Sequence, residues 1–467
     1  MVLGLSNKKV LSLFSFSIFC ILILPRLMSY GVFFDGVIYG MISKNLAEGL
    51  GTAWSPYFNQ LNPTFFEHPP LVFWVQSIFF KVFGDSRFID VFYSFFTGLV
   101  TLFLMKSIWK RTTTLNVGSW FVVILFSVIP MISWIYANNM LENTLTVLTL
   151  LTVLSIIFTL KVSNSFFLIL GGVFSGIFLI ASFLAKGPTG LFPLATPFLF
   201  VVVYRSNLKK SFLIYIGILI ALLIFLLYLW YTPEAAKSLK QYLGQQVFAS
   251  LSGKRKNSSH FYVFGKLLAE LGIPIIFSLF LYLTKRKKGK LTITKEFWLF
   301  FLIALSASAP IALSSKQMMW YLLPSLPFYC LALAALFRPF AFVVETSLTY
   351  RKSAYLLGTS IVIFLIAILS MFLDRNTVRK DFHYNQDFSV QQLEMEKDEL
   401  VTVCPKTLVT HFAIQASFMR FHRASITTEG NHKYLLVKSG SRCTIPASYK
   451  KFHPPKSVNF TLYKKGS

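Results

Sequence analysis

A small set of ionisable side chains stands at the edges of the apolar segments of this sequence. Such positions suggest function, because a charge buried unpaired at a membrane costs several kcal/mol. A carboxylate there could take a proton from a hydroxyl or amine acceptor, and cations could stabilise a phosphate that leaves. The set consists of Asp35, Glu67, His68, Glu142, Lys186, His260 and Lys316.

The acidic positions also have structural interpretations. Asp35 could cap a helix that begins near Gly36. Glu142 could simply begin its helix, where a carboxylate suits the helix dipole. Glu67 and His68, which stand before two prolines, could belong to a solvated turn. Each residue alone is therefore ambiguous, and the functional interpretation depends on whether the set gathers in one place.

The basic positions are ambiguous in the same way. Lys186 could be a lysine in a turn whose charged end reaches toward water. His260, in a polar loop, could lie on the surface. Lys316 stands at the start of a predicted helix, where the dipole disfavours a cation, so another group is expected to hold it.

Three common catalytic signatures are missing from the sequence. It has no GxxxxGK[ST] phosphate-binding loop, no Asp-x-Asp pair of the kind that holds a metal in many nucleotide-sugar enzymes, and no G-x-S-x-G nucleophile elbow. Carboxylates accompanied by cations instead suit transfer from a lipid-linked phosphosugar, because its phosphate would lie at the membrane interface and its tail between apolar helices.

The composition indicates a polytopic, all-α membrane protein. Of the 467 residues, 55% are hydrophobic and only 13% are charged, and several apolar runs approach the length that spans a bilayer. The formal net charge of +27 does not indicate nucleic-acid binding here, because the basic residues lie mostly in short loops, where lysine and arginine set membrane orientation.

Eleven spanning helices are predicted, and the first is taken as a retained helix because no small-residue cleavage site follows it. The run 71–83 is too short to span and is predicted to lie at the interface or dip into the membrane. The predicted spans are 10–28, 88–108, 117–137, 141–160, 166–185, 188–204, 211–231, 262–283, 296–314, 318–338 and 353–373.

The charge pattern predicts that the amino terminus is cytoplasmic. With that orientation every second loop is basic, including the runs 285–288 and 351–352, as expected for cytoplasmic loops. If 71–83 spanned the membrane, these basic loops would face outward. With the amino terminus in the cytoplasm and 71–83 not spanning, all seven ionisable residues of the set lie on the outer side, together with the tail that follows residue 373.

The tail, 374–467, is predicted to be a small α/β domain outside the membrane. The segments "DELVTV", "KYLLVKS" and "VNFTLYKK" alternate as strands do, and 405–423 could hold a helix. Of the four cysteines, Cys20 and Cys330 lie in apolar runs. Cys404 and Cys443 lie in the tail and could pair in an oxidising compartment, which two cysteines alone do not establish.

The order of the motifs over about 10–340 resembles bacterial members of the protein O-mannosyltransferase superfamily, which includes the lipid A aminoarabinose transferases. These are C-type membrane glycosyltransferases. The matching elements, in order, are Asp35 with Tyr39, Glu67 to Leu71 (Glu-x-Pro-Pro-Leu), Glu142, Ala185 to Pro188, Ser315-Lys316, and Tyr321 to Pro324.

The resemblance implies a role for each matched residue. Asp35 is similar to the catalytic carboxylate, and Glu67 and Glu142 to further carboxylates of the cavity, with Glu67 and His68 as possible ligands of a divalent metal ion; no cofactor is otherwise implied. The residues expected to bind the donor and its phosphate are Tyr39, His68, Lys186, His260, Lys316 and Tyr321.

Two departures from the family pattern concern specificity. Aminoarabinose transferases carry Asp-Glu-x-Arg-Tyr and Glu-Lys-Pro-Pro where this chain has Asp35 to Tyr39 and Glu67 to Pro70, so Ile38 and His68 replace two cations. The phosphate charge must then be met by Lys186, Lys316 and His68, or by the other candidate cations Arg26, Lys44 and 254–256. Gly36 also departs from the Asp-Glu of eukaryotic mannosyltransferases, so protein mannosylation is not favoured.

Transfer of a sugar from a polyprenyl-phosphate donor is therefore the leading functional hypothesis. The acceptor would be lipid A, another glycolipid, a polysaccharide or a protein, and the site would face the periplasm from a bacterial inner membrane. A transporter or flippase of lipid-linked sugars is the alternative, although transporters tend to place charge near the midplane and to show repeats. A binding protein whose tail does the work ranks last, because the tail shows no motif.

Overall fold

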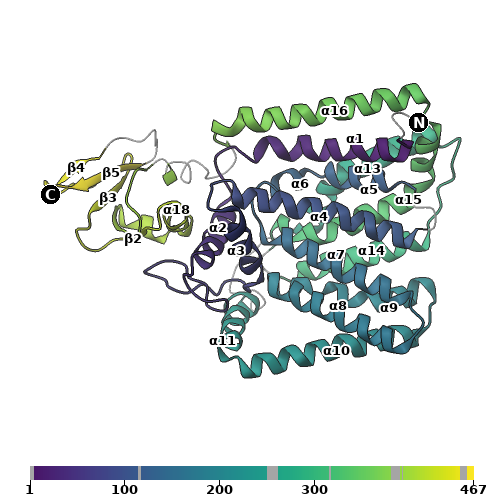
Figure 1. The fold of residues 1–467 in the computed structure, drawn as a ribbon, viewed down its shortest axis with the longest axis horizontal. Coiled ribbons are helices and arrows are strands. Elements are labelled where there is room, and N and C mark those ends of the chain that lie inside the picture. Colours follow the sequence, from purple (N-terminus) through teal and green to yellow (C-terminus); the bar gives the residue numbers. More distant parts are fainter. Residues whose placement is uncertain are drawn as a thin grey trace.

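The chain forms a bundle of long helices with a small sheet domain at one end (Figure 1). The computed structural model describes residues 5–113, 117–249, 261–314, 317–379, 390–391, 393–452 and 460–466. The bundle runs through α1 (Asn7–Ile23), α4 (Ile89–Thr112), α7 (Leu141–Leu160), α8 (Ser165–Lys186), α10 (Leu208–Tyr231), α13 (Tyr262–Lys285), α14 (Lys295–Ser308), α15 (Leu326–Ser347) and α16 (Tyr350–Leu373).

Within the described residues, nine helices are long and apolar enough to cross a membrane. The chain is thus a multi-pass membrane protein, as predicted, but two of the eleven expected spans are not continuous helices. The stretch 117–137 divides into α5 (Ser119–Ser127) and α6 (Pro130–Ile135), which follow one another beside α1 in Figure 1. Pro130 causes the break, because it has no N–H to donate and its ring opposes the preceding turn.

The stretch 188–204 is broken for the same reason. It consists of η2 (Gly187–Gly190), η3 (Phe192–Ala195) and α9 (Thr196–Tyr204), each with a proline near its start. Both η3 and α9 pack against α14. Hydropathy alone does not detect such breaks, because proline interrupts hydrogen bonding without making the segment polar.

Short helices gather at one end of the bundle, where the sheet domain also lies (Figure 1). They are α2 (Phe34–Ala47), α3 (Leu71–Phe83) and α11 (Pro233–Tyr242), which continues into a π-helix, η4 (Leu243–Phe248). The helix α3 has the bounds predicted for the non-spanning run. The remaining 3₁₀ turns are η1 (Leu24–Arg26), η5 (Ala309–Leu313), η6 (Met319–Ser325), η7 (Asp374–Asn376) and η8 (Lys406–Thr410).

In its described residues, the carboxy-terminal part contains a five-stranded sheet and the helix α18, in agreement with the predicted small α/β domain. The strand order is β2-β1-β3-β5-β4, with β1 parallel to β2 and β3, and β5 antiparallel to β3 and β4. A disulfide joins Cys404 and Cys443. The elements are β1 (Leu400–Cys404), α18 (Phe412–His422), β2 (Ser425–Thr427), β3 (Tyr434–Lys438), β4 (Tyr449–Lys451) and β5 (Phe460–Lys465).

The sheet domain packs on the end of the bundle through α18. Ala416 and Met419 of this helix share a buried apolar cluster with Met41 and Ile42 of α2, and α18 faces α2 in Figure 1. The helix that carries Asp35 and Tyr39 is therefore in direct contact with the sheet domain.

Candidate active site

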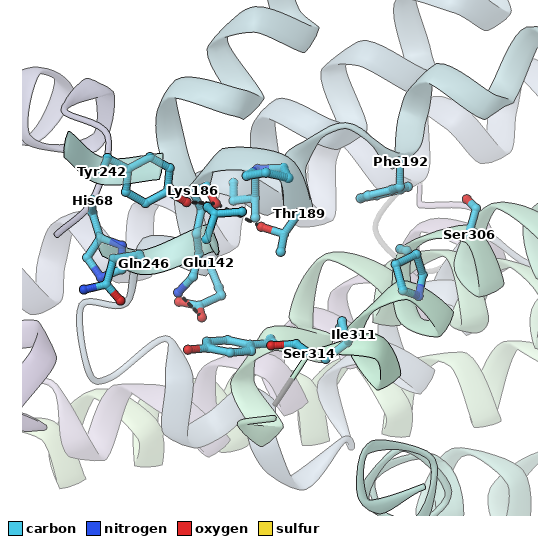
Figure 2. A pocket seen from close by; sticks show the side chains of 16 residues that line it. His68, Glu142, Lys186, Thr189, Phe192, Tyr242, Gln246, Ser306, Ile311 and Ser314 are labelled. Atoms are coloured by element: carbon cyan, nitrogen blue, oxygen red, sulfur yellow. Dashed lines mark hydrogen bonds and ion pairs between the residues drawn. The ribbon is translucent and has the colours of Figure 1, made fainter. Parts of the chain in front are cut away.

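A cavity of about 320 Å³ opens between α7, α8, the π-helix and the segment that follows α14. Its side chains divide by polarity (Figure 2). His68, Glu142, Lys186, Tyr242 and Gln246 lie toward one end, with the ring of Tyr321 against Lys186. The remaining lining residues are mostly apolar and include three with hydroxyl groups: Leu145, Pro188, Thr189, Phe192, Val247, Ser306, Ala307, Pro310, Ile311 and Ser314. This division suits a ligand with a polar head and an apolar tail.

An ion pair between Lys186 and Glu142 occupies the polar end of the cavity. Glu142 is fully buried in the first turn of α7, and Lys186, 8% exposed, is the last residue of α8. The carboxylate partner of Lys186 therefore comes from another helix, 44 residues away in the chain. The second oxygen of Glu142, Oε2, has no hydrogen-bond partner among the described residues, so it remains able to accept a bond from a ligand.

The turn after Lys186 has a conformation that only glycine adopts easily. Gly187 has φ 72°, and a Cβ there would lie 2.0 Å from the hydroxyl oxygen of Tyr242. That hydroxyl donates to the Lys186 carbonyl at 3.3 Å. On the other side, the Lys186 ammonium lies 4.8 Å from the centre of the Tyr321 ring. The lysine is thus held in place by contacts on three sides.

Tyr39 connects α2 with the segment before α3. Its hydroxyl and His68 Nε2 share a hydrogen bond of 3.1 Å. Burial first, and then the charges of Asp35, Glu142 and Glu67, raise the pKa of Tyr39 well above its ordinary value, so the phenol stays neutral. These three carboxylates are therefore close enough to act on one hydroxyl, although they are far apart in the sequence.

Asp35 and Glu67 lie near the cavity but do not line it. Asp35 is half-buried in the first turn of α2. The N-cap residue of this helix is Phe33, which makes no side-chain capping hydrogen bond. Glu67 is exposed. Pro70 is the residue that precedes the first turn of α3, so the segment with Glu67 and His68 leads directly into that helix.

The structure thus brings together Tyr39, His68, Glu142, Lys186 and Tyr321. The predicted residues His260 and Lys316, and the basic run 254–256, lie outside the described residues. Two other candidate cations are not in the cavity. Arg26 is exposed. Lys44 is buried and paired with Asp85 at 2.8 Å, and it does not line the cavity.

Two residues at the polar end of the cavity escaped the sequence analysis. Tyr242 ends α11, and Gln246 lies in the π-helix that follows. Helices of this type often occur at functional sites, but their i→i+5 bonds leave no recognisable spacing in a sequence. Metal binding has little support in the described part of the chain, where no three His, Cys, Asp or Glu residues cluster as ligands.

The comparisons with known proteins agree with this fold. The family model of dolichyl-phosphate-mannose-protein mannosyltransferase matches residues 67–231. No curated protein matches the chain in sequence. The crystal structure of ArnT from Cupriavidus metallidurans bound to undecaprenyl phosphate has a TM-score of 0.61 at 12% identity, covering 97% of both chains. The apo state of ArnT gives 0.61 at 13% identity, covering 95% of both chains.

A third solved structure is more distant. It is the archaeal oligosaccharyltransferase AglB from Archaeoglobus fulgidus, with a TM-score of 0.47 at 11% identity, covering 92% of this chain and 69% of that one. A TM-score below 0.5 does not establish a shared fold. The chain thus has the fold of ArnT, and its predicted resemblance to the protein O-mannosyltransferase superfamily is confirmed by the family match over residues 67–231.

Proposed function

We propose that this protein transfers a sugar from a polyprenyl-phosphate donor to an acceptor, with Asp35 as the catalytic carboxylate. The observation that supports this most directly is the cavity, which joins an ion pair and polar side chains at one end to an apolar remainder. A lipid phosphate has the same division. The undecaprenyl phosphate bound by ArnT, which has the same fold, is a ligand of this kind.

The cations at the polar end would stabilise the phosphate as the sugar leaves. Lys186 can contribute charge-assisted hydrogen bonds, and His68 can add another when it is protonated. The hydroxyl of Tyr39, which is neutral, can donate to a phosphate oxygen or orient His68. A ligand phosphate would compete with Glu142 for Lys186, so donor binding would loosen the ion pair.

Asp35 suits the role of base better than Glu142. Glu142 is fully buried and already engaged with Lys186. Asp35 is half-exposed at the end of the bundle where an acceptor can approach. It would take the proton of the acceptor hydroxyl or amine as that atom attacks the anomeric carbon, and the lipid phosphate would leave with the electrons of the broken bond.

We also propose that this end of the bundle faces the periplasm of a bacterial inner membrane. That end carries the short helices α2, α3 and α11 and the sheet domain (Figure 1). The basic loops that are predicted to be cytoplasmic connect helices at the opposite end of the bundle. The acceptor would be a glycolipid, a polysaccharide or a protein. A flippase is less favoured, because the paired charges lie near the end of the bundle with the short helices.

The test is a transfer assay with purified protein in liposomes. Undecaprenyl-phosphate pentoses, hexoses and amino sugars are supplied with lipid A, glycan or peptide acceptors, and products are identified by mass spectrometry. Asp35→Asn should lower turnover by about 10²–10⁴-fold, the usual contribution of a general base. Asp374→Asn, in η7 at the same end of the bundle, is the matched control and should retain activity.

Absence of transfer from every lipid-phosphate sugar would refute the proposed reaction. If transfer occurs but Asp35→Asn keeps more than about a tenth of the wild-type turnover, Asp35 is not the base.

A further inference from the structure

An arginine of the sheet domain is buried against the elements that carry the candidate active site. Arg420, in α18, is 2% exposed. Its guanidinium binds Asp85 at 2.7 Å, Asp90 at 3.2 Å and the Ser86 carbonyl at 2.9 Å. Its own carbonyl accepts a hydrogen bond from Lys44 at 2.9 Å. A single residue thus joins the sheet domain to α2, to α4 and to the loop before α4.

The contacts of Arg420 continue to α2 through buried polar side chains. Gln76 of α3 donates to Asp90 at 3.3 Å and accepts from Ser43 of α2 at 3.1 Å. Gln76 also donates to Asn139 at 3.1 Å, and Asn139 donates to the carbonyl of Gly36 at 3.1 Å. The network therefore extends from Arg420 to the residue that follows Asp35.

The close approach of α2 to these partners depends on two glycines. A Cβ at Gly40 would lie 2.2 Å from an oxygen of Asp90, and a Cβ at Gly36 would lie 2.0 Å from the carbonyl oxygen of Asn138. Both glycines also lower the intrinsic stability of a helix of only 14 residues. The position of α2 must therefore come from its neighbours rather than from its own helix propensity.

A second arginine that follows the last long helix, Arg379, contacts the residues that hold the beginning of α2. Arg379, which follows α16, donates to Asn138 Oδ1 at 3.0 Å and to the Ala137 carbonyl at 2.9 Å. The same Asn138 oxygen accepts from the backbone N–H of Phe33, at the start of α2, at 2.9 Å. The two ends of α2 are thus each linked to residues that follow the last long helix.

We propose that Arg420 is a positioning residue for the transfer reaction. It fixes α2 against α4 so that Asp35 and Tyr39 keep their places beside the cavity, and it makes the sheet domain part of the catalytic apparatus. This inference rests on the proposed function, in which Asp35 is the base. Arg420 itself does not line the cavity, so it acts through α2 rather than on the substrate.

The alternative is that Arg420 only attaches the sheet domain. The two roles differ in what the full-length protein does when the arginine is replaced. Simple attachment would change the exchange of the sheet domain and leave α2 and turnover as they are. Positioning would loosen α2 and lower turnover at saturating donor, while the binding of undecaprenyl phosphate, through α7 and α8, stays the same.

The experiment combines hydrogen–deuterium exchange with kinetics on the full chain. Arg420→Gln is compared with Arg420→Lys, which keeps the charge but loses the fork of donors, and with Arg442→Gln, an exposed arginine of the same domain. Asp85→Asn is the second variant. Its side chain is 42% exposed, so this variant is expected to fold even where Arg420→Gln does not.

We expect amides of 34–47 to exchange at least about tenfold faster in Arg420→Gln, less so in Arg420→Lys and Asp85→Asn, and at the wild-type rate in Arg442→Gln. Turnover should fall in the same order, with undecaprenyl phosphate bound within about twofold of wild type. The inference is overturned if α2 exchanges normally in Arg420→Gln and Asp85→Asn, or if faster exchange leaves turnover intact.

The two proposals fail separately. If the wild type transfers no sugar, the proposed function fails, and the exchange measurement still decides whether Arg420 holds α2. If the wild type transfers sugar and α2 is insensitive to Arg420, the reaction stands and the positioning role is wrong.

Discussion

Replacing Lys186 by methionine should expose two different contributions of this lysine. Met has nearly the same length but no charge, so the change removes the partner of the buried Glu142 carboxylate. Breaking a buried ion pair from one side costs about 3–5 kcal/mol, because the remaining charge is left without compensation. The single variant is therefore expected to be clearly less stable than the wild type in detergent.

A double variant separates stability from ligand binding. Lys186→Met combined with Glu142→Gln leaves no unpaired charge at that place, so most of the lost stability should return. Donor binding should not return, because the ammonium that we propose to meet the phosphate is still absent. One charge-assisted bond is worth about 1.5–3 kcal/mol, which corresponds to roughly ten- to a hundredfold weaker binding.

The assay measures unfolding and undecaprenyl phosphate affinity for both single variants and the double variant. Lys209→Met, at the start of α10 near the other end of the bundle, controls for the general loss of a basic residue. Wild-type affinity in the stable double variant would refute the reasoning, since Lys186 would then serve only to neutralise Glu142. Equal stability of Lys186→Met and the wild type would refute the energetic part.

Three further predictions test other parts of the molecule. His68→Lys should make turnover less sensitive to pH between about 6 and 8, because an imidazole changes charge there and an ammonium does not; an unchanged pH profile would mean that His68 does not meet the phosphate. A reporter fused after Ser467 should read as periplasmic, and a cytoplasmic signal would reverse the side of every site residue. Burial, and then the charge of Lys44, lowers the pKa of His422 below its ordinary value of 6.5, and the hydrogen bond between its ring and the Val390 carbonyl opposes this shift. Just below pH 6.5 the unfolded chain therefore binds more protons than the folded chain. The free energy of unfolding of the sheet domain should therefore be highest above about pH 6.5 and should fall as the pH drops toward the pKa of His422 in the folded state. Unfolding measured across this pH range should show the dependence in the wild type and not in His422→Gln.

The sequence predicted the elements of the fold well wherever local periodicity carries the signal. The bounds of α3 and three of the strands follow from apolar length and alternation, which depend on neighbouring residues only. The break at Pro130 went unpredicted because the segment stays apolar on both sides of it. The strands β2 and β4 have three residues each, which is too short for an alternation to be recognised.

Four of the candidate residues line the cavity, namely His68, Glu142, Lys186 and Tyr321, but the sequence did not predict how they pair. Motif order selected Glu142 and Lys186, yet nothing local shows that residues 44 positions apart form an ion pair. The pairing of Lys44 went unpredicted for the same reason, since its partner Asp85 is distant in sequence. Gly36, noted only as a departure from the family pattern, has a physical reason in the structure: the Asn138 carbonyl occupies the space of its side chain.

The buried arginine of α18 also has a consequence for how the protein is made. Lys44 and Arg420 are 376 residues apart in the chain, an interval that a ribosome needs roughly 20 to 75 s to translate at 5–20 residues per second. During that time α2, with Asp35, is already synthesised but lacks the partner that holds it. The end of the bundle that carries the candidate site should therefore mature last, and translation that stops before α18 should yield an inserted bundle without activity.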